Sequence, residues 1–180
     1  MKQIIKQDYN ALILKSVKIT AGAILAILFA SCLNLKYSAT AGIITILSIQ
    51  NTKKETIQTA LARGEAFCCA LLVSFLCYNF FGYTTAAFGI YLLIFTTLCL
   101  TMKWSSAIAM DSVLITHFLA EKTMNIPMIT NEISLFVIGA GIGVLLNLSL
   151  RPKENEWKNK MAKADESISA IIKRMAENRI

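Results

Sequence analysis

The sequence predicts an all-α, polytopic membrane protein with six transmembrane helices, followed by a cytoplasmic C-terminal helix. The first observation is composition: 56% of the 180 residues are hydrophobic, 16% are charged and only two are proline. The second is that the apolar residues form long runs, several of them close to the ~20 residues that a helix needs to cross ~30 Å of hydrocarbon. The third is that Lys and Arg gather at particular ends of these runs, as they do in cytoplasmic loops of membrane proteins.

The predicted spans follow a basic, amphipathic lead-in over residues 2–15. Lys36 and Tyr37 mark the far interface after the first span, and the second span is unusually short. Gly82 and Tyr83 predict a tight turn between the third and fourth spans. The six predicted spans cover residues 16–34, 37–51, 65–81, 84–102, 104–120 and 133–150.

The positive charge of the chain is explained by its predicted topology. The formal net charge is +7. Six spans place both termini on the same side of the membrane, and with that side in the cytoplasm only Lys36 and Lys122 fall outside. The basic charge therefore does not indicate nucleic-acid binding. The predicted surroundings of the spans are the lipid bilayer.

The stretch over residues 37–65 predicts a change from a short span to a surface helix. Thr52 and Glu55 have the T-x-x-E spacing of a capping box. Apolar residues recur at helical spacing behind this cap, and Arg63 belongs to a basic flank beside them. The sequence therefore predicts a helix that lies along the membrane surface and ends where the third span begins, at Glu65.

The composition changes abruptly after Arg151, which divides the chain into a transmembrane domain over residues 1–151 and a cytoplasmic amphipathic helix over residues 152–180. Apolar residues of this helix follow the spacing of a heptad seam. The seam predicts a homo-oligomer that assembles through its spans and residues 153–180. The alternative is that the stripe rests on the membrane domain of its own chain or on lipid head groups. The seam consists of Trp157, Met161, Ala164, Ile168, Ile171 and Met175.

The chain resembles itself at a shift of 67 residues. Residues 36–38 (KYS) meet residues 103–105 (KWS), and Glu65 meets Glu132. Each half holds three predicted spans, an odd number, so the halves would lie inverted relative to each other. This predicts a 3+3 inverted repeat, an architecture of many secondary transporters, with the substrate site where the halves meet. Chance similarity between apolar helices is the alternative.

Asp111 is the strongest candidate for a functional side chain, because it lies near the middle of the fifth predicted span. A carboxylate at that depth costs at least ~2.5–3.5 kcal/mol, so such residues normally face a cavity or a partner. We expect it to bind a coupling proton; a structural hydrogen bond to Ser112 or to a neighbouring helix is the alternative. His117 lies ~9 Å further along the helix axis. It is a candidate proton relay or substrate contact, or else a packing histidine at the interface.

Four further residues complete the predicted substrate and proton pathway. Gln50 ends the second span from the cytoplasmic side and meets His117 in the repeat. Lys36 and Lys103 are expected to draw anions to opposite mouths. Glu65 opens the third span, where a carboxylate also suits a helix N-terminus for electrostatic reasons alone.

The sequence lacks the motifs of soluble enzymes. It contains no G-x-S-x-G, no H-E-x-x-H and no phosphate-binding loop, and its single histidine cannot build a multi-histidine metal site. The run Gly139, Gly141 and Gly143 lies within a predicted span, so it predicts close helix packing and not a nucleotide loop. We therefore expect neither an enzyme nor a bound metal or other cofactor.

Three segments of the chain resemble the membrane domain of the aromatic acid exporter family, also called fusaric acid resistance protein-like or FUSC-type. They are residues 38–64 with ILSIQNTKKETIQTALARG, residues 112–118 (SVLITHF) and residues 139–148 (GAGIGVLLNL). The resemblance implies six spans, a bacterial inner-membrane location, an oligomeric state and export of aromatic carboxylates or related anions. Relatives often carry a further cytoplasmic domain, whereas this sequence ends at Ile180.

These features together predict a membrane transporter that exports small organic anions, either coupled to protons or by facilitated diffusion. A passive anion channel is one alternative, and its conductance would persist without any proton gradient. A non-transporting, oligomeric membrane scaffold is the other. The scaffold predicts that polar substitutions in the C-terminal seam change assembly while Asp111→Asn has no effect.

Overall fold

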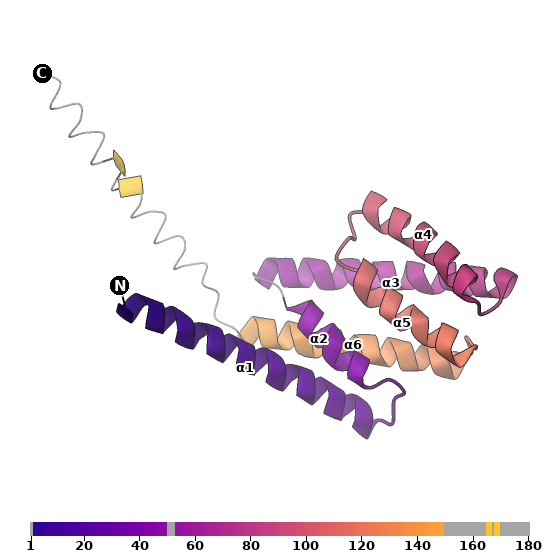
Figure 1. Ribbon diagram of the computed structural model, residues 1–180, viewed down its shortest axis with the longest axis horizontal. Coiled ribbons are helices and arrows are strands. Elements are labelled where there is room, and N and C mark those ends of the chain that lie inside the picture. The colour runs from indigo at the N-terminus through magenta and orange to yellow at the C-terminus, as the bar shows by residue number, and fades with distance from the viewer. Residues whose placement is uncertain (1, 50–52, 150–164, 167, 170–180) are drawn as a thin grey trace, which may run out of the picture. The chain divides into compact units, whose positions relative to one another are not determined.

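A computed structural model of the chain describes residues 2–49, 53–149, 165–166 and 168–169. The regular elements described between residues 2 and 149 are all helices, which confirms the predicted all-α class (Figure 1). The chain divides into two units, residues 1–149 and 150–180. Gln50 and nearly all of the predicted C-terminal seam lie outside the described residues. The helices are α1 (Lys2–Cys32), α2 (Ala39–Ser48), α3 (Lys53–Phe81), α4 (Thr85–Thr101), α5 (Ile108–Glu121) and α6 (Ile126–Ser149).

The helices of the first unit pack as two groups of three. α1 packs against α2 and α6, and α4 packs against α3 and α5. Across the boundary between these groups, α3 contacts α6 and α2 contacts α5. Figure 1 shows α1 and α4 on opposite sides, with the other helices between them. We call the two sets the α1 group (α1, α2 and α6) and the α4 group (α4, α5 and α3).

The outside of the bundle is apolar, whereas its interior contains polar side chains. Leu72 on α3, Leu93 on α4 and Leu145 on α6 are each at least 66% exposed. This distribution reverses that of a soluble protein and suits a bilayer, where lipid contacts the outside and polar groups turn inward. The buried polar and charged side chains among the described residues are Thr40, Thr45, Ser48, Thr56, Arg63, Ser74, Asp111, His117, Glu132 and Asn147.

Three helices are long and apolar enough to cross a membrane. They contain the candidate spans Lys15–Cys32, Glu55–Phe81 and Ile126–Leu148. The apolar helices α2 and α4 are shorter, with 10 and 17 residues. At 1.5 Å per residue, α2 is about 15 Å long, half the thickness of the hydrocarbon core. The assignment of all six helices as spans therefore stays a prediction.

The predicted surface helix before Glu65 is wrong. α3 runs without a break from Lys53 to Phe81, so Glu65 lies inside a helix and does not begin one. Arg63, assigned to a basic flank on the membrane surface, is 4% exposed, whereas Leu61 is 65% exposed. The physical reason is that lipid attracts the apolar stripe of such a helix outward, so its charged side chain turns toward the protein.

Two glycines of α6 allow α2 to approach closely. A Cβ atom on Gly139 would lie 2.6 Å from a carbonyl oxygen of α2, and one on Gly143 would lie 2.5 Å from the Cβ atom of Ser48. The hydroxyl of Thr45 donates a hydrogen bond to the Gly139 carbonyl at 3.0 Å. The predicted packing role is confirmed at these two positions. A Cβ atom on Gly141 would instead meet nothing within 4 Å.

The turn between α1 and α2 recurs between α4 and α5. In the first turn, the N–H groups of residues 33, 34 and 35 donate to the carbonyls of residues 29, 31 and 30. In the second, residues 102, 103 and 104 donate to residues 98, 100 and 99, each 69 positions later. Asn34 (φ 53°) and Lys103 (φ 61°) share the left-handed conformation. The shift differs from the 67 of the sequence comparison because the KYS and KWS residues occupy different places in their turns.

We expect Gly143→Ala to destabilise the bundle, because the new methyl group overlaps α2. Overpacking of this kind costs about 1–3 kcal/mol. Gly141→Ala is the matched control, since it adds the same group to the same helix on an open side, where alanine favours helix formation by up to ~1 kcal/mol. Thermal unfolding of the purified variants in detergent measures both. Equal melting temperatures for the two variants would contradict the close contact between α2 and α6.

Candidate functional site

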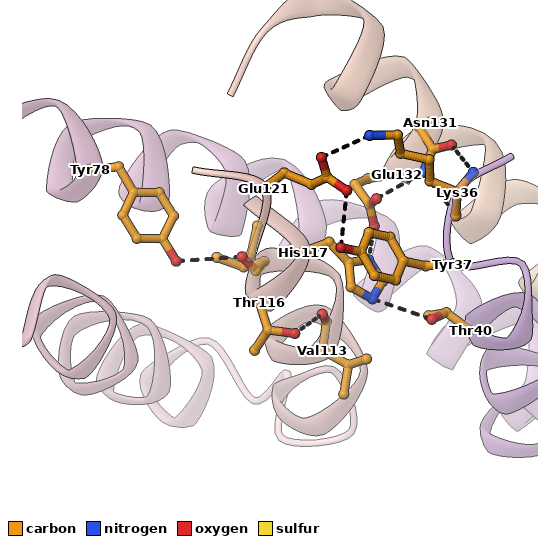
Figure 2. A network of polar contacts seen from close by, with 11 residues as sticks. Lys36, Tyr37, Thr40, Tyr78, Val113, Thr116, His117, Glu121, Asn131 and Glu132 are labelled. Carbon is orange, nitrogen blue, oxygen red and sulfur yellow. Dashed lines mark hydrogen bonds and ion pairs between the residues drawn. The ribbon is translucent and has the colours of Figure 1, made fainter. Parts of the chain in front are cut away.

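Two sets of polar side chains lie on the boundary between the α1 group and the α4 group. The first set, which we call the Arg63 cluster, consists of Ser48, Arg63, Tyr91, Asp111 and Ser112. The second set lies where α1 ends and α2 begins, and Figure 2 shows it from close by. We call it the Lys36 cluster, and it consists of Lys36, Tyr37, Thr40, His117, Glu121, Asn131 and Glu132.

Arg63 carries a positive charge from α3 into the interior. One terminal nitrogen of its guanidinium group donates to the hydroxyl of Ser48, at the end of α2, over 3.4 Å. Such a distance is long for a hydrogen bond. The Nε atom is buried and has no partner among the described residues. Because a guanidinium group stays charged in proteins, this site keeps a cation with unused hydrogen-bonding capacity.

Asp111 lies close to this cation and is fully buried. It belongs to the first turn of α5, not to the middle of a span as the sequence suggested. Neither carboxylate oxygen has a hydrogen-bond partner among the described residues, and the same is true of the hydroxyls of Ser112 and Tyr91. Native proteins satisfy nearly all buried polar groups. The Arg63 cluster therefore has the capacity to bind a small polar or charged ligand.

The Lys36 cluster is built around a buried acid–base pair. Nδ1 of His117 lies 2.7 Å from Oε2 of Glu132, and the two residues are 7% and 0% exposed. Oε1 of Glu132 accepts a hydrogen bond from the amide of Asn131 at 2.9 Å. Nε2 of His117 lies 3.4 Å from the hydroxyl of Thr40, which fixes the second face of the ring. The pair is thus satisfied by its neighbours, in contrast to the Arg63 cluster.

Tyr37 covers the histidine of this pair. The two rings stack with their centroids 4.1 Å apart and their planes 3° from parallel (Figure 2). The hydroxyl of Tyr37 donates to Oε1 of Glu121 at 3.1 Å. Tyr37 has φ 58°, a left-handed conformation that a bulky residue rarely adopts. Such strain costs ~1–3 kcal/mol, and here it accompanies the position of the ring over His117.

An exposed ion pair joins the two helix groups at the edge of this cluster. Nζ of Lys36 lies 2.7 Å from Oε2 of Glu121. The backbone of Lys36 also donates to, and accepts from, the side-chain amide of Asn131. Both charged residues lie outside the predicted spans. Their mutual hydrogen bond lowers the pKa of Glu121 and raises the pKa of Lys36.

The predicted site residues divide between these clusters and the surface. Asp111 belongs to the Arg63 cluster, and His117 and Lys36 belong to the Lys36 cluster. Lys103 is exposed in the turn between α4 and α5, and Glu65 is exposed on α3. The side chains of these last two make no hydrogen bond or ion pair with a residue that the structure describes.

Two charged residues were missed as site residues. Arg63 was assigned to the surface, and Glu132 was noted only as the repeat partner of Glu65. The signal for Arg63 was its place within a run from Glu55 to Phe81 that is apolar enough to span a membrane. A charge inside such a run normally faces the protein interior. The sequence carries no comparable signal for Glu132, which lies next to a polar loop.

The central contacts of the two clusters occupy equivalent positions in the chain. Ser48 bonds to Arg63, and 69 residues later His117 bonds to Glu132. This is the shift that relates the two turns. In each case a residue near the end of a short helix contacts a charged residue of the next helix, which belongs to the other group. One position carries a cation and its equivalent carries an anion.

The apolar exterior and the charged interior define a helical membrane protein. Residues 11–150 match the aromatic acid exporter family member 1, so the chain belongs to the aromatic acid exporter family, and the suspected resemblance is confirmed. Membership indicates a transporter and not an enzyme. The chain is 32% identical over 158 residues to the uncharacterized protein YqjA of Bacillus subtilis (strain 168), covering 88% of this chain and 49% of that relative. It therefore spans about half the length of the relative. No solved structure matches.

We expect acid to remove the contribution of the Lys36–Glu121 pair to stability. Because the pKa of Glu121 is lowered in the folded protein, its contribution is present above the ordinary carboxyl pKa and is lost as the pH falls through the lowered value. Glu121→Gln should therefore melt below the native chain near pH 7, and the difference should shrink below about pH 4. Glu65→Gln, which removes an exposed carboxylate, should match the native chain at both pH values. A deficit of Glu121→Gln that persists in acid would contradict the ion pair as its cause.

Proposed function

We propose that the chain exports small organic anions, with aromatic carboxylates as the substrate class, and that Arg63 binds the substrate carboxylate. The observation that carries this proposal is the buried, unpartnered charge of the Arg63 cluster. Membership of an exporter family supports the transport part of the proposal. The site works in the bacterial inner membrane, with both termini in the cytoplasm.

Arg63 suits a carboxylate ligand better than any other described side chain of the interior. The planar guanidinium fork matches a carboxylate with two parallel hydrogen bonds. The rings of Tyr91 and Phe95 stack on α4 with their centroids 5.4 Å apart, and the Tyr91 hydroxyl lies near Asp111. An aromatic acid can therefore direct its carboxylate to Arg63 and its ring toward an aromatic wall.

Asp111 makes anion binding depend on a proton. The substrate carboxylate and the ionised Asp111 carboxylate compete for the same buried cation. In a site of low dielectric constant, a second anion beside one cation is costly. Substrate therefore binds when Asp111 is protonated, and loss of that proton favours its release. Anion and proton then move together, and the transported species is electroneutral.

The position of the site agrees with six spans arranged as a 3+3 inverted repeat. The recurring turns and the equivalent contacts at a shift of 69 residues support this part of the proposal. Under it, α1, α2 and α3 correspond to α4, α5 and α6. The short helices α2 and α5 then meet near the midplane, where inverted-repeat transporters bind their substrates.

We expect proteoliposomes that contain the native chain to take up radiolabelled 4-hydroxybenzoate faster than empty liposomes, which report diffusion of the neutral acid. Arg63→Gln should lower the protein-dependent rate about tenfold or more, because it removes the charged partner of the carboxylate. Lys18→Gln removes an exposed positive charge and should leave the rate unchanged.

Asp111→Asn tests the coupling separately. Native uptake should rise when the external buffer is more acidic than the lumen, and it should not respond to a membrane potential. Asp111→Asn should transport without this pH dependence, because asparagine leaves Arg63 permanently available. Conductance of the anion by the native chain would instead indicate a channel. Equal uptake by the native chain and Arg63→Gln would refute the proposed site.

A further inference from the structure

The Lys36 cluster closes one end of the boundary between the two helix groups. Each of its contacts joins the α1 group to the α4 group: Lys36 to Glu121, Tyr37 to His117, and Glu132 to His117. Figure 2 shows Tyr37 lying over the histidine ring, with Lys36 and Glu121 above it. Movement between the groups at this end must therefore break the His117–Glu132 contact.

The pair carries a net charge that depends on one proton. With one proton on the imidazole, the ring is neutral and the pair has the charge of the Glu132 carboxylate. A second proton on the imidazole gives an imidazolium–carboxylate pair with no net charge. The hydrogen-bond partners fit both forms, since the Thr40 hydroxyl can donate to Nε2 or accept from it. Burial disfavours the form with net charge, because an uncompensated ion is costly in low dielectric.

The charged and titratable groups around the pair do not supply another counterion. From the α5 side, Glu121 is paired with Lys36. From the α1–α2 turn, Tyr37 is a neutral phenol bonded to Glu121. From α3, Tyr78 bonds to the carbonyl of Ile115 at 3.4 Å and not to the pair. Within the described residues, α1 and α4 place no charged side chain in hydrogen-bond or ion-pair contact with it.

We infer that the His117–Glu132 pair is a second proton-binding site, separate from Asp111, which takes up one proton when the Lys36 end closes and releases it when that end opens. The proton comes from water at that end and binds the lone pair of an imidazole nitrogen. The equivalent contact of the other half, Arg63 with Ser48, contains no group that titrates near neutral pH. Only the Lys36 end is therefore sensitive to pH in this way. The inference rests on the proposed function, because it assigns the movement to transport.

The test measures exchange of radiolabelled for unlabelled 4-hydroxybenzoate across proteoliposomes with the same pH on both sides. Exchange needs both ends to open but needs no gradient. Asp111→Asn is the background, because it removes the other proposed proton site. Since proton binding favours closure, exchange by Asp111→Asn should slow roughly fivefold or more as the pH falls from about 8.5 to about 6.5. Adding Glu132→Gln or His117→Gln should abolish this dependence, whereas adding the exposed control Glu65→Gln should keep it.

The outcomes distinguish the inference from the proposed function. Glutamine can accept from Asn131 and donate to the ring, and thermal unfolding of each purified variant checks that it folds. A pH dependence that survives in both double variants, or one that is missing from Asp111→Asn, overturns the inference alone. Absence of exchange by the native chain overturns the proposed function and, with it, this inference.

Discussion

The structure depends on one constraint: charged groups hidden from lipid must find their partners inside the protein. Arg63 is the clearest case, because its helix exposes apolar side chains on one side and turns a guanidinium group inward. The only described hydrogen bond of that group is a long one to Ser48. A charge kept in this way is costly, and the helices around it are arranged so that the cost can be met by a ligand. The polar interior and the apolar exterior follow from the same requirement.

The two helix groups explain why the polar contacts lie where they do. Each group packs its own helices through apolar contacts, and one apolar core lies mainly among α3, α4 and α5. The described polar contacts between charged residues instead cross from one group to the other, as does the bond between Asn147 and Thr56. Apolar packing therefore stabilises each group, while exchangeable hydrogen bonds and ion pairs join them. A boundary made of polar contacts can open without exposing either apolar core.

Sequence reasoning reached the class, the family and part of the site, and its errors have physical causes. Long apolar runs identify helices because hydrocarbon thickness sets their length, and a carboxylate inside such a run identified Asp111. Arg63 was misplaced because the same apolar stripe can face lipid either from a surface helix or from a span. The repeat was aligned two residues out of register because similar side chains in a turn do not mark equivalent backbone positions. The pairing of His117 with Glu132 depends on how α5 and α6 meet, which no local pattern encodes.

The close contact between α2 and the glycines of α6 has a mechanical consequence. Gly139 and Gly143 leave no space for α2 to shift on α6, so α2 is a short rod fixed along a longer one. One end of the rod carries Ser48, against Arg63, and the other carries Thr40, beside His117. The two ends are about 12 Å apart along the axis. Because a stiff rod cannot bend over that length, a tilt that lifts one end from its partner changes the fit at the other. The substrate cation and the proton site would then report to each other through the rigidity of a single ten-residue helix.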